Sequence, residues 1–238
     1  MFKFHNVNKN IMFNLLRKKN VGICYYSSNN NKYQDIKVEL KKPYLAYWIR
    51  LNRPKVHNAF NANLMEELRH AFSNIPSEAR CIVFTGAGKS FSSGADLNYM
   101  KSMVNHSIEE NQQDSLELFD MFYKIRQAPI PVIAAVNGTC MAGGTGLVAA
   151  SDFALCIDDA NFALTEVRLG LIPAVISKFV MDKIGKGHSS RYMLTAEIFQ
   201  GKRAQEIGLI SESVKNNEIL IDKVIQITKI INNNSPDA

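Results

Sequence analysis

A glycine-rich turn in the middle of the chain is the feature best suited to chemistry. Residues 131–136 (PVIAAV) are an apolar run rich in β-branched side chains, which predicts a buried strand. Residues 142–146 (AGGTG) then open an apolar segment that predicts a helix to about residue 151. A turn between strand and helix aims backbone N–H groups and the positive helix end at one point, and glycine lets a ligand approach. That point suits an anion, or a carbonyl oxygen that becomes one.

A second loop of small residues has the same character. Residues 81–85 (CIVFT) predict a buried strand, and residues 86–96 (GAGKSFSSGAD) form a loop before a helix that begins near Asp96. Two such loops can supply two N–H donors to one oxygen, which is the arrangement of an oxyanion hole. The alternative is that both turns are tight for packing reasons alone.

Four ordered segments resemble one known family. They are NRPKVHNAF at residues 52–60, SFSSGADL at 90–97, AAVNGTCMAGGTGL at 134–147 and TEVRLGLIPA at 165–174. In order and spacing they resemble the signature segments of the enoyl-CoA hydratase/isomerase (crotonase) superfamily, over about residues 37–238. The resemblance implies an α/β fold, a spiral of stacked ββα units, and acyl-CoA thioester substrates. It also implies assembly as a homotrimer or hexamer.

The resemblance assigns catalytic roles to three residues. By motif position, the backbone N–H groups of Ala95 and Gly143 are the oxyanion donors, and Glu166 is the proton carrier. A carboxyl beside apolar walls can have its pKa raised toward neutrality and then serve as both base and acid. The neighbouring apolar side chains favour burial of Glu166 over a surface position at a loop end; they are Phe162, Leu164, Val167 and Leu169.

Gly146 departs from the family pattern. Familiar hydratases carry a first glutamate three residues after the oxyanion glycine, and that position is Gly146 in this chain. A scheme in which two carboxylates hold one water is therefore not available. Either a hydratase works with Glu166 alone, or the enzyme is a Δ3,Δ2-enoyl-CoA isomerase that needs no water. A non-catalytic acyl-CoA-binding subunit is a third reading.

The wider segment favours a hydratase. GLVAASDFAL and LTEVRLGLIPAVISKFV resemble mitochondrial hydratases of 3-methylglutaconyl-CoA, an intermediate of leucine degradation, so we expect a hydro-lyase of that pathway or of fatty-acid β-oxidation. Arg168 is placed to meet the distal carboxylate of such a substrate. Its alternative role is a solvent-facing or ion-paired arginine at a helix entry.

The resemblance also locates the coenzyme A contacts. Lys55, Val56 and His57 are expected along the nucleotide portion, and the segment Ser93, Asp96 and Leu97 along the pantetheine. Lys55 has the alternative of an ordinary solvated loop lysine. Asp96 is also expected to cap its helix, and Asp152 is expected to be a structural acid at a helix end. Thr145 is expected either to position water or to pack the helix.

The elements that must position these residues alternate between strand and helix, which predicts an α/β fold. Asn61 is expected to cap one helix and Ser107 another, the latter with an apolar stripe of Leu116, Phe119, Met121, Phe122 and Ile125. Strands are predicted at 36–40, 44–51, 80–85, 131–136, 153–157, 160–164 and 209–214, and helices at 61–75, 96–104, 107–127, 142–151, 173–185, 189–196, 202–207 and 218–231.

Charge is concentrated at the start of the chain. Residues 1–34 hold six of the 28 Lys and Arg residues and no acidic residue, so the remaining 22 basic residues balance the 22 acidic ones. This segment is typical of a mitochondrial targeting peptide, with an asparagine-rich leader as the alternative. We therefore expect a transit peptide at 1–34, a matrix location, and a single crotonase-like domain at 35–238. A neutral domain also argues against nucleic-acid partners.

Several groups are expected to be absent. The five histidines show no metal-ligand spacing and the four cysteines form no C-x-x-C pair, so we expect neither a metal nor a disulfide. No cofactor is implied, because coenzyme A arrives as part of the substrate. The longest apolar run of the N-terminal segment is too short for a membrane span. Compared with the family, the C-terminal helical region is expected to be cut short after residue 238.

Overall fold

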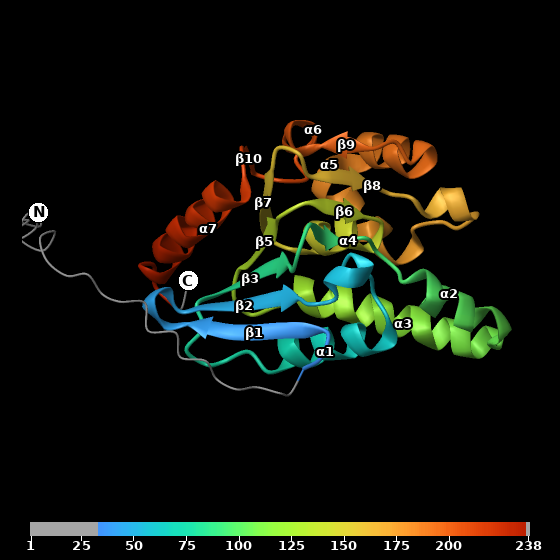
Figure 1. The fold of residues 1–238 in the computed structure, drawn as a ribbon, viewed down its shortest axis with the longest axis horizontal. Coiled ribbons are helices and arrows are strands. Elements are labelled where there is room, and N and C mark those ends of the chain that lie inside the picture. Colours follow the sequence, from blue (N-terminus) through green and yellow to red (C-terminus); the bar gives the residue numbers. More distant parts are fainter. Residues whose placement is uncertain (1–32, 237–238) are drawn as a thin grey trace, which may run out of the picture. The chain divides into compact units, whose positions relative to one another are not determined.

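The computed structural model describes residues 33–236, and Figure 1 shows how their elements are arranged. A six-stranded sheet has the order β1-β2-β3-β5-β7-β10. Its first two strands form an antiparallel hairpin, and the other neighbouring pairs are parallel. The bounds are β1 (Ile36–Lys41), β2 (Ala46–Leu51), β3 (Cys81–Gly86), β5 (Val132–Val136), β7 (Phe153–Ile157) and β10 (Glu212–Val214).

A smaller sheet accompanies it, with the order β4-β6-β8-β9. Its strands are β4 (Ser90–Ser92), β6 (Thr139–Met141), β8 (Asn161–Ala163) and β9 (Phe199–Gln200). Each long strand β3, β5 and β7 is followed by a short strand of the second sheet and then by a helix. The chain therefore consists largely of ββα units, which confirms the predicted α/β class.

The helices in the described part of the chain are α1 (Ala62–Ser73), α2 (Leu97–Ser102), α3 (Ile108–Arg126), α4 (Gly143–Ala150), α5 (Ala174–Thr195), α6 (Gly201–Glu206) and α7 (Asn217–Asn232). The predicted caps are confirmed: the Asn61 side chain accepts from the Leu64 N–H, and Ser107 forms a capping box with Glu110. None of the helices between residues 33 and 236 is long and apolar enough to cross a bilayer.

The two faces of the large sheet are buried against different helices. In β3, Ile82 and Phe84 pack with side chains of α1, α3, α4 and α5, whereas Cys81 and Val83 pack with Leu220 of α7. Successive residues of a strand point to opposite faces, so a continuous apolar run such as β3 is the expected sequence of a strand covered on both sides.

Two details differ from the sequence-based expectations, and a third agrees with them. The strands β4, β6 and β9 lie where no strand was predicted, because two or three residues are too few to show a period of two. The predicted separation of the helices 173–185 and 189–196 is confirmed, because α5 consists of two helical parts that meet at a kink at Gly185, with φ 74° and ψ 161°. In α3, Leu116 and Phe119 are 62% and 41% exposed, so they were wrongly placed in the buried stripe.

Candidate active site

The first turn leads from β6 into α4. Ala142 precedes the helix with φ 46° and ψ −117°, a left-handed conformation that is costly for a residue with a Cβ. Gly143 is the first residue of α4, so its N–H has no partner within the helix. The strained turn thus presents a helix N-terminus whose first N–H group is available to a ligand.

The second turn is held by a short parallel bridge between Phe60 and Ala95. The Phe60 N–H donates to the Gly94 carbonyl at 2.7 Å, and the Asp96 N–H donates to the Phe60 carbonyl at 2.8 Å. In a parallel bridge the neighbours of the central residue make the hydrogen bonds, so the N–H of Ala95 points away from Phe60. The bridge therefore fixes the direction of the Ala95 N–H group without using it.

Close packing brings the two turns together. A Cβ on Gly94, which has φ +85°, would lie 2.8 Å from the Ala142 Cβ and 3.1 Å from the Gly143 nitrogen. A Cβ on Gly144 would lie 2.5 Å from the Ser92 carbonyl oxygen. Glycine is required at both positions because the backbones touch there. Ala95 and Gly143 consequently lie on adjoining segments, as a shared oxyanion site requires; their catalytic role stays a prediction.

Glu166 follows β8 and opens a short 3-10 turn over Glu166–Leu169. The preceding strand is tied to the first turn, because the Ala142 N–H donates to the Ala163 carbonyl at 2.8 Å. The Oε2 atom of Glu166 is buried and has no hydrogen-bond partner among residues 33–236. Burial raises the pKa of this carboxyl above its ordinary value of 4.5, against a smaller lowering by its own backbone N–H.

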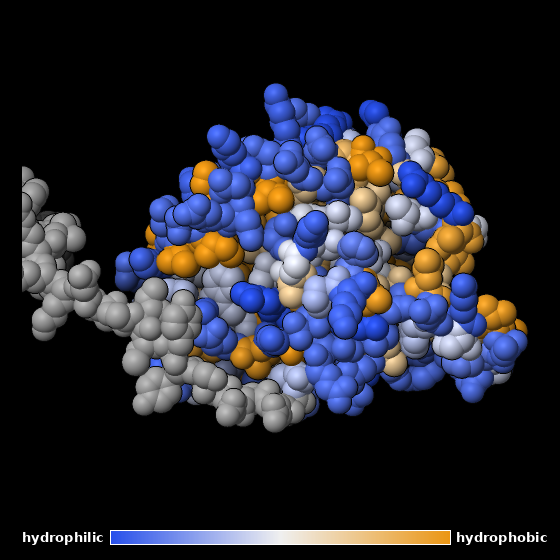
Figure 2. All heavy atoms as spheres, viewed as in Figure 1, coloured by the Kyte–Doolittle hydropathy of each residue, from blue (hydrophilic) through white to orange (hydrophobic). Residues whose placement is uncertain are grey.

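The apolar surroundings of Glu166 are only partly those expected. Phe162 and Leu164 are buried, but Val167 and Leu169 are 40% and 56% exposed. The expected burial is confirmed for the Oε2 atom of Glu166, although Val167 and Leu169 point outward from the 3-10 turn. Figure 2 shows apolar atoms on the right-hand side, where Figure 1 draws the segment after β8.

Gly146 faces other helices closely. A Cβ at this position would lie 2.4 Å from the Ile176 Cγ2 atom of α5 and 3.1 Å from the Phe122 Cε1 atom of α3. Real Cβ atoms essentially never come so close to a neighbour. The sequence showed that position 146 has no side chain, and the structure adds that it has no room for one.

Thr145 and Cys140 are packing residues. The Thr145 hydroxyl donates to the carbonyls of Cys140 and Ala163 at 2.9 and 3.2 Å, and the side chain is 1% exposed. These bonds favour the packing role, because the hydroxyl proton is taken up inside the fold, and the positioning of a water stays a prediction. Burial raises the pKa of the Cys140 thiol well above its ordinary value, so this thiol stays neutral.

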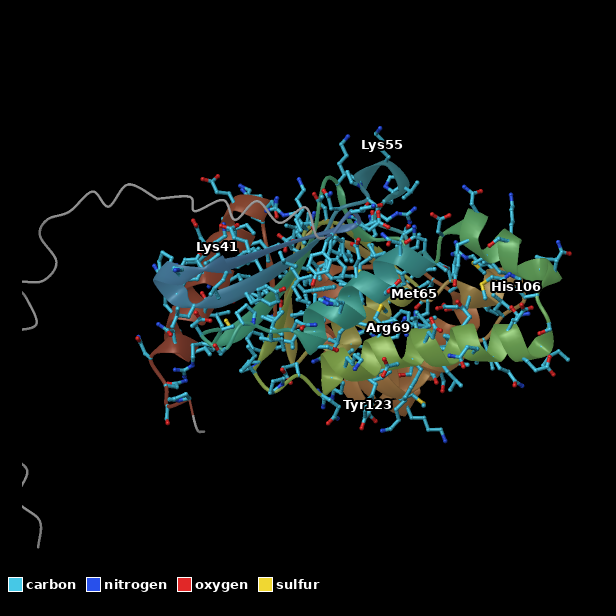
Figure 3. All side chains as sticks on the ribbon, turned by 90° about the horizontal axis from the view of Figure 1, so that it is seen from below. Lys41, Lys55, Met65, Arg69, His106 and Tyr123 are labelled. Carbon is cyan, nitrogen blue, oxygen red and sulfur yellow. The ribbon has the colours of Figure 1, made fainter. Side chains whose placement is uncertain are left out.

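The segments expected to contact coenzyme A lie beside each other. Lys55 and Val56 are exposed in a 3-10 turn, and the His57 carbonyl accepts from the Ser93 N–H at 3.0 Å. Figure 3 shows the Lys55 side chain projecting outward from its turn. Leu97, on the second segment, is 61% exposed. This surface is open to a ligand, and its use by coenzyme A stays a prediction.

The predicted structural acids take their expected places. The Asp96 carboxylate accepts from the Asn98 N–H at 2.9 Å as the cap of α2, and from the Arg53 guanidinium at 3.0 Å. Burial works against the charge, but these bonds lower the pKa of Asp96 overall. Asp152 accepts from the Val132 N–H at 2.8 Å, which joins the end of α4 to β5.

Arg168 is engaged within the fold. Its guanidinium donates to the Ala196 carbonyl at 2.7 Å, at the C-terminal end of α5. This bond ties the turn that carries Glu166 to α5. A contact with a substrate carboxylate, the other role considered for Arg168, stays a prediction.

Sequence reasoning missed Asn58 as an organiser of the site. Its amide group donates to the carbonyls of Ala87, Ser90 and Phe91 at 2.8–3.1 Å, and its Oδ1 accepts from the Arg53 N–H. Asn58 is fully buried with φ 56°. The available signal was an asparagine in a loop, since asparagine tolerates left-handed backbone and can bond several backbone groups.

The described residues hold no group of three or more His, Cys, Asp or Glu side chains that could bind a metal ion. Cys81, Cys140 and Cys156 are buried free thiols.

Comparison with known proteins agrees with this geometry. Residues 45–238 match the model of the enoyl-CoA hydratase/isomerase family. The chain is 33% identical over 199 residues to hydroxycinnamoyl-CoA hydratase-lyase of Pseudomonas fluorescens, covering 79% of this chain and 69% of that one. It is 30% identical over 229 residues to mitochondrial Delta(3,5)-Delta(2,4)-dienoyl-CoA isomerase of Homo sapiens, covering 91% and 70%.

A solved structure is similar throughout the described part. The enoyl-CoA hydratase of Shewanella pealeana superimposes with a TM-score of 0.82 at 32% identity, covering 86% of this chain and 76% of that one. Among the similar sequences, some are mitochondrial and an Arabidopsis thaliana one is peroxisomal. Both hydratases and isomerases are thus represented among the proteins that resemble this chain.

Proposed function

Because the chain belongs to the enoyl-CoA hydratase/isomerase family, we propose that it hydrates a 2-enoyl thioester of coenzyme A with Glu166 as the single catalytic carboxyl. The observation that carries this proposal is the buried, unpartnered Oε2 atom of Glu166 beside the strand that supports Ala142. A buried carboxyl with a raised pKa is suited to exchange protons with a substrate.

The proposed reaction adds water across C2=C3. The thioester oxygen accepts from the N–H groups of Ala95 and Gly143, and the Glu166 carboxylate removes a proton from water. The hydroxide oxygen bonds to C3, the π electrons move onto the thioester as an enolate, and Glu166 returns the proton to C2. Loss of one oxyanion donor typically raises such a barrier by about 3 kcal/mol.

The acyl group is proposed from the sequence. The segment around Glu166 resembles hydratases of 3-methylglutaconyl-CoA, which would place the chain in leucine degradation, with fatty-acid β-oxidation as the alternative pathway. A distal carboxylate on the substrate would need a cation. Arg168 could meet it if its bond to the Ala196 carbonyl is exchanged for the ligand.

Isomerisation is the second candidate, and Gly146 favours it. The position that would carry a second carboxylate is closed by Ile176 and Phe122, and one carboxyl suffices to move a proton between C2 and C4. The likeness to a dienoyl-CoA isomerase is consistent with such chemistry. A non-catalytic acyl-CoA-binding subunit is the alternative in which the protein is not an enzyme.

The assay that separates these readings follows the enoyl absorbance with the full chain. Hydration removes the absorbance of crotonyl-CoA or 3-methylglutaconyl-CoA, whereas isomerisation of a 3-enoyl-CoA creates it. We expect loss of absorbance with the native chain and at least a 100-fold slower reaction with Glu166→Gln. Glu218→Gln, an exposed glutamate in α7, is the matched control and should react normally.

Creation of absorbance from the 3-enoyl substrate alone would replace hydration by isomerisation. Binding of the thioester without turnover of either substrate would support the non-catalytic binding subunit. Equal rates for native chain and Glu166→Gln would remove Glu166 from the mechanism in both enzymatic readings.

A mitochondrial matrix location and a homotrimer or hexamer are proposed alongside the reaction. The acid-free basic segment 1–34 supports the location, and the usual oligomeric assembly of this family supports the stoichiometry. Residues 1–32 lie outside the described structure. Fusion of residues 1–34 to a fluorescent protein tests the location, and failure to enter mitochondria would contradict it.

A further inference from the structure

The space into which a side chain at position 146 would extend is already filled by neighbouring side chains. Gly143 and Gly146 are three residues apart in α4, so they lie on the same face of the helix. The Cβ position of Gly146 is 2.4 Å from the Cγ2 atom and 3.0 Å from the Cβ atom of Ile176. A methyl group of α5 thus occupies the volume into which any side chain at position 146 would extend.

This methyl group belongs to a rigid apolar wall. Ile176 and Phe122 are 3% and 0% exposed. The Phe122 ring contacts Phe60 and Phe179, with ring centroids 6.4 and 5.9 Å apart. The Phe60 ring in turn lies 2.6 Å from the Cβ position of Gly143. One continuous set of side chains therefore closes both glycine positions of α4, and a β-branched residue in a helix has little rotamer freedom with which to retreat.

The wall is also connected to the catalytic carboxyl. Ile176 lies in the first turn of α5, ten residues after Glu166. The Leu171 N–H donates to the Glu166 carbonyl at 3.1 Å, which folds the connecting segment back on itself. The side chain that fills the space at Gly146 is thus held by the segment that positions Glu166.

We propose that Ile176 is a specificity-determining residue of this site, because it excludes a second carboxylate, and the water such a group would hold, from the space beside Gly146. The proposal rests on the proposed function, since it assumes that Glu166 and the two turns form the active site. It adds that the one-carboxyl chemistry depends on two positions, 146 and 176, and not on Gly146 alone. The competing explanation is helix packing without any effect on the reaction.

A stability cycle tests the coupling independently of activity. Gly146→Ala in the native background should lower Tm by roughly 3–10 °C, because overpacking strains the core. In an Ile176→Ala or Ile176→Leu background the same change should lower Tm by less than half as much. Ile176→Leu keeps the volume but removes the Cγ2 atom, so it remains informative if Ile176→Ala does not fold.

Ile184→Ala is the matched control for this cycle. Ile184 is a buried isoleucine of α5, and none of its atoms is among those nearest to the Cβ position of Gly146. It should leave the Tm loss of Gly146→Ala unchanged. Equal Tm losses in all backgrounds would overturn the coupling between positions 146 and 176.

The reaction test introduces a carboxylate. Gly146→Glu alone should not increase hydration of crotonyl-CoA, whereas Gly146→Glu with Ile176→Leu or Ile176→Ala should raise the ratio of hydration to 3-enoyl isomerisation at least tenfold over the background variant. It should also add a second titrating group to the pH profile. If the Ile176 variants lessen the Tm loss of Gly146→Ala but the ratio of hydration to isomerisation does not change, Ile176 is a packing residue without a role in specificity.

Failure of the proposed function has a different signature. Absence of turnover by the native chain on both substrates would overturn the enzymatic proposal and with it the specificity role of Ile176. The Tm coupling would persist in that case, since it depends on packing alone.

Discussion

The buried Oε2 atom of Glu166 has no partner among residues 33–236, which makes this carboxyl a costly feature of the folded chain. An ionised carboxylate loses its hydration there, and this loss raises its pKa. The same environment suits Glu166 to the proposed proton transfer, because a carboxyl whose pKa is raised toward neutrality can both take up and release a proton.

The cost of this carboxyl predicts a pH-dependent stability. Glu166 binds its proton more tightly in the folded than in the unfolded chain, so its stabilising contribution is complete below the ordinary pKa of 4.5. That contribution is lost as pH rises through the raised folded-state pKa. Glu166→Gln never ionises, so its Tm relative to the native chain should rise between pH 4.5 and pH 8, as measured by calorimetry.

A Tm difference between Glu166→Gln and the native chain that stays constant over this pH range would show that this carboxyl does not titrate differently on folding.

Single residues also mark what the sequence can and cannot predict. Glu166 and the turn glycines could be located from motif position, because the residue types of a motif and their order are visible in the sequence. The outward direction of Val167 and Leu169 and the contact between Gly146 and Ile176 did not follow. They depend on how a 3-10 turn and a helix pack, which no local pattern records.

At the scale of elements, the site depends on how closely two turns approach. Gly94 combines a positive φ with a Cβ position 2.8 Å from the Ala142 Cβ. Any side chain there would both strain the backbone and push the Ala95 segment away from the N-terminus of α4. The geometry of the proposed oxyanion site therefore depends on the backbone contact between the end of β4 and the start of α4, which requires glycine at positions 94 and 144.

Gly94→Ala should consequently cost about 3 kcal/mol of stability, from backbone strain and overpacking together. Gly208→Ala is the matched control, because Gly208 has a similar φ of +81° and its nearest contact is an ordinary 3.7 Å. It should cost only the strain, about 1–2 kcal/mol. Chemical denaturation measures both, and the account predicts a lower kcat for Gly94→Ala alone.

Equal costs for the two alanine variants, or a normal kcat for Gly94→Ala, would show that the close approach at Gly94 does not shape the site.

The capped helices at Asn61 and Ser107 were predictable, since capping is local. The strands β4, β6 and β9 were not, because they exist only through pairing with distant segments.

At the scale of the whole molecule, repeated ββα units place two similar turns side by side. The strands β4 and β6 are parallel neighbours and end at the same edge of their sheet, so the turns after them meet although about fifty residues separate these turns in the chain.

The proposed role of Glu166 as proton carrier leaves an isotopic trace in the product. The full chain is reacted with crotonyl-CoA and 3-methylglutaconyl-CoA in D2O, and the product is measured by mass spectrometry. We predict a hydroxyacyl product with one carbon-bound deuterium at C2 from the native chain, and at least 100-fold less of it from Glu166→Gln in the same time. The same yield of deuterated product from Glu166→Gln, or no hydroxyacyl product from the native chain, would contradict the account.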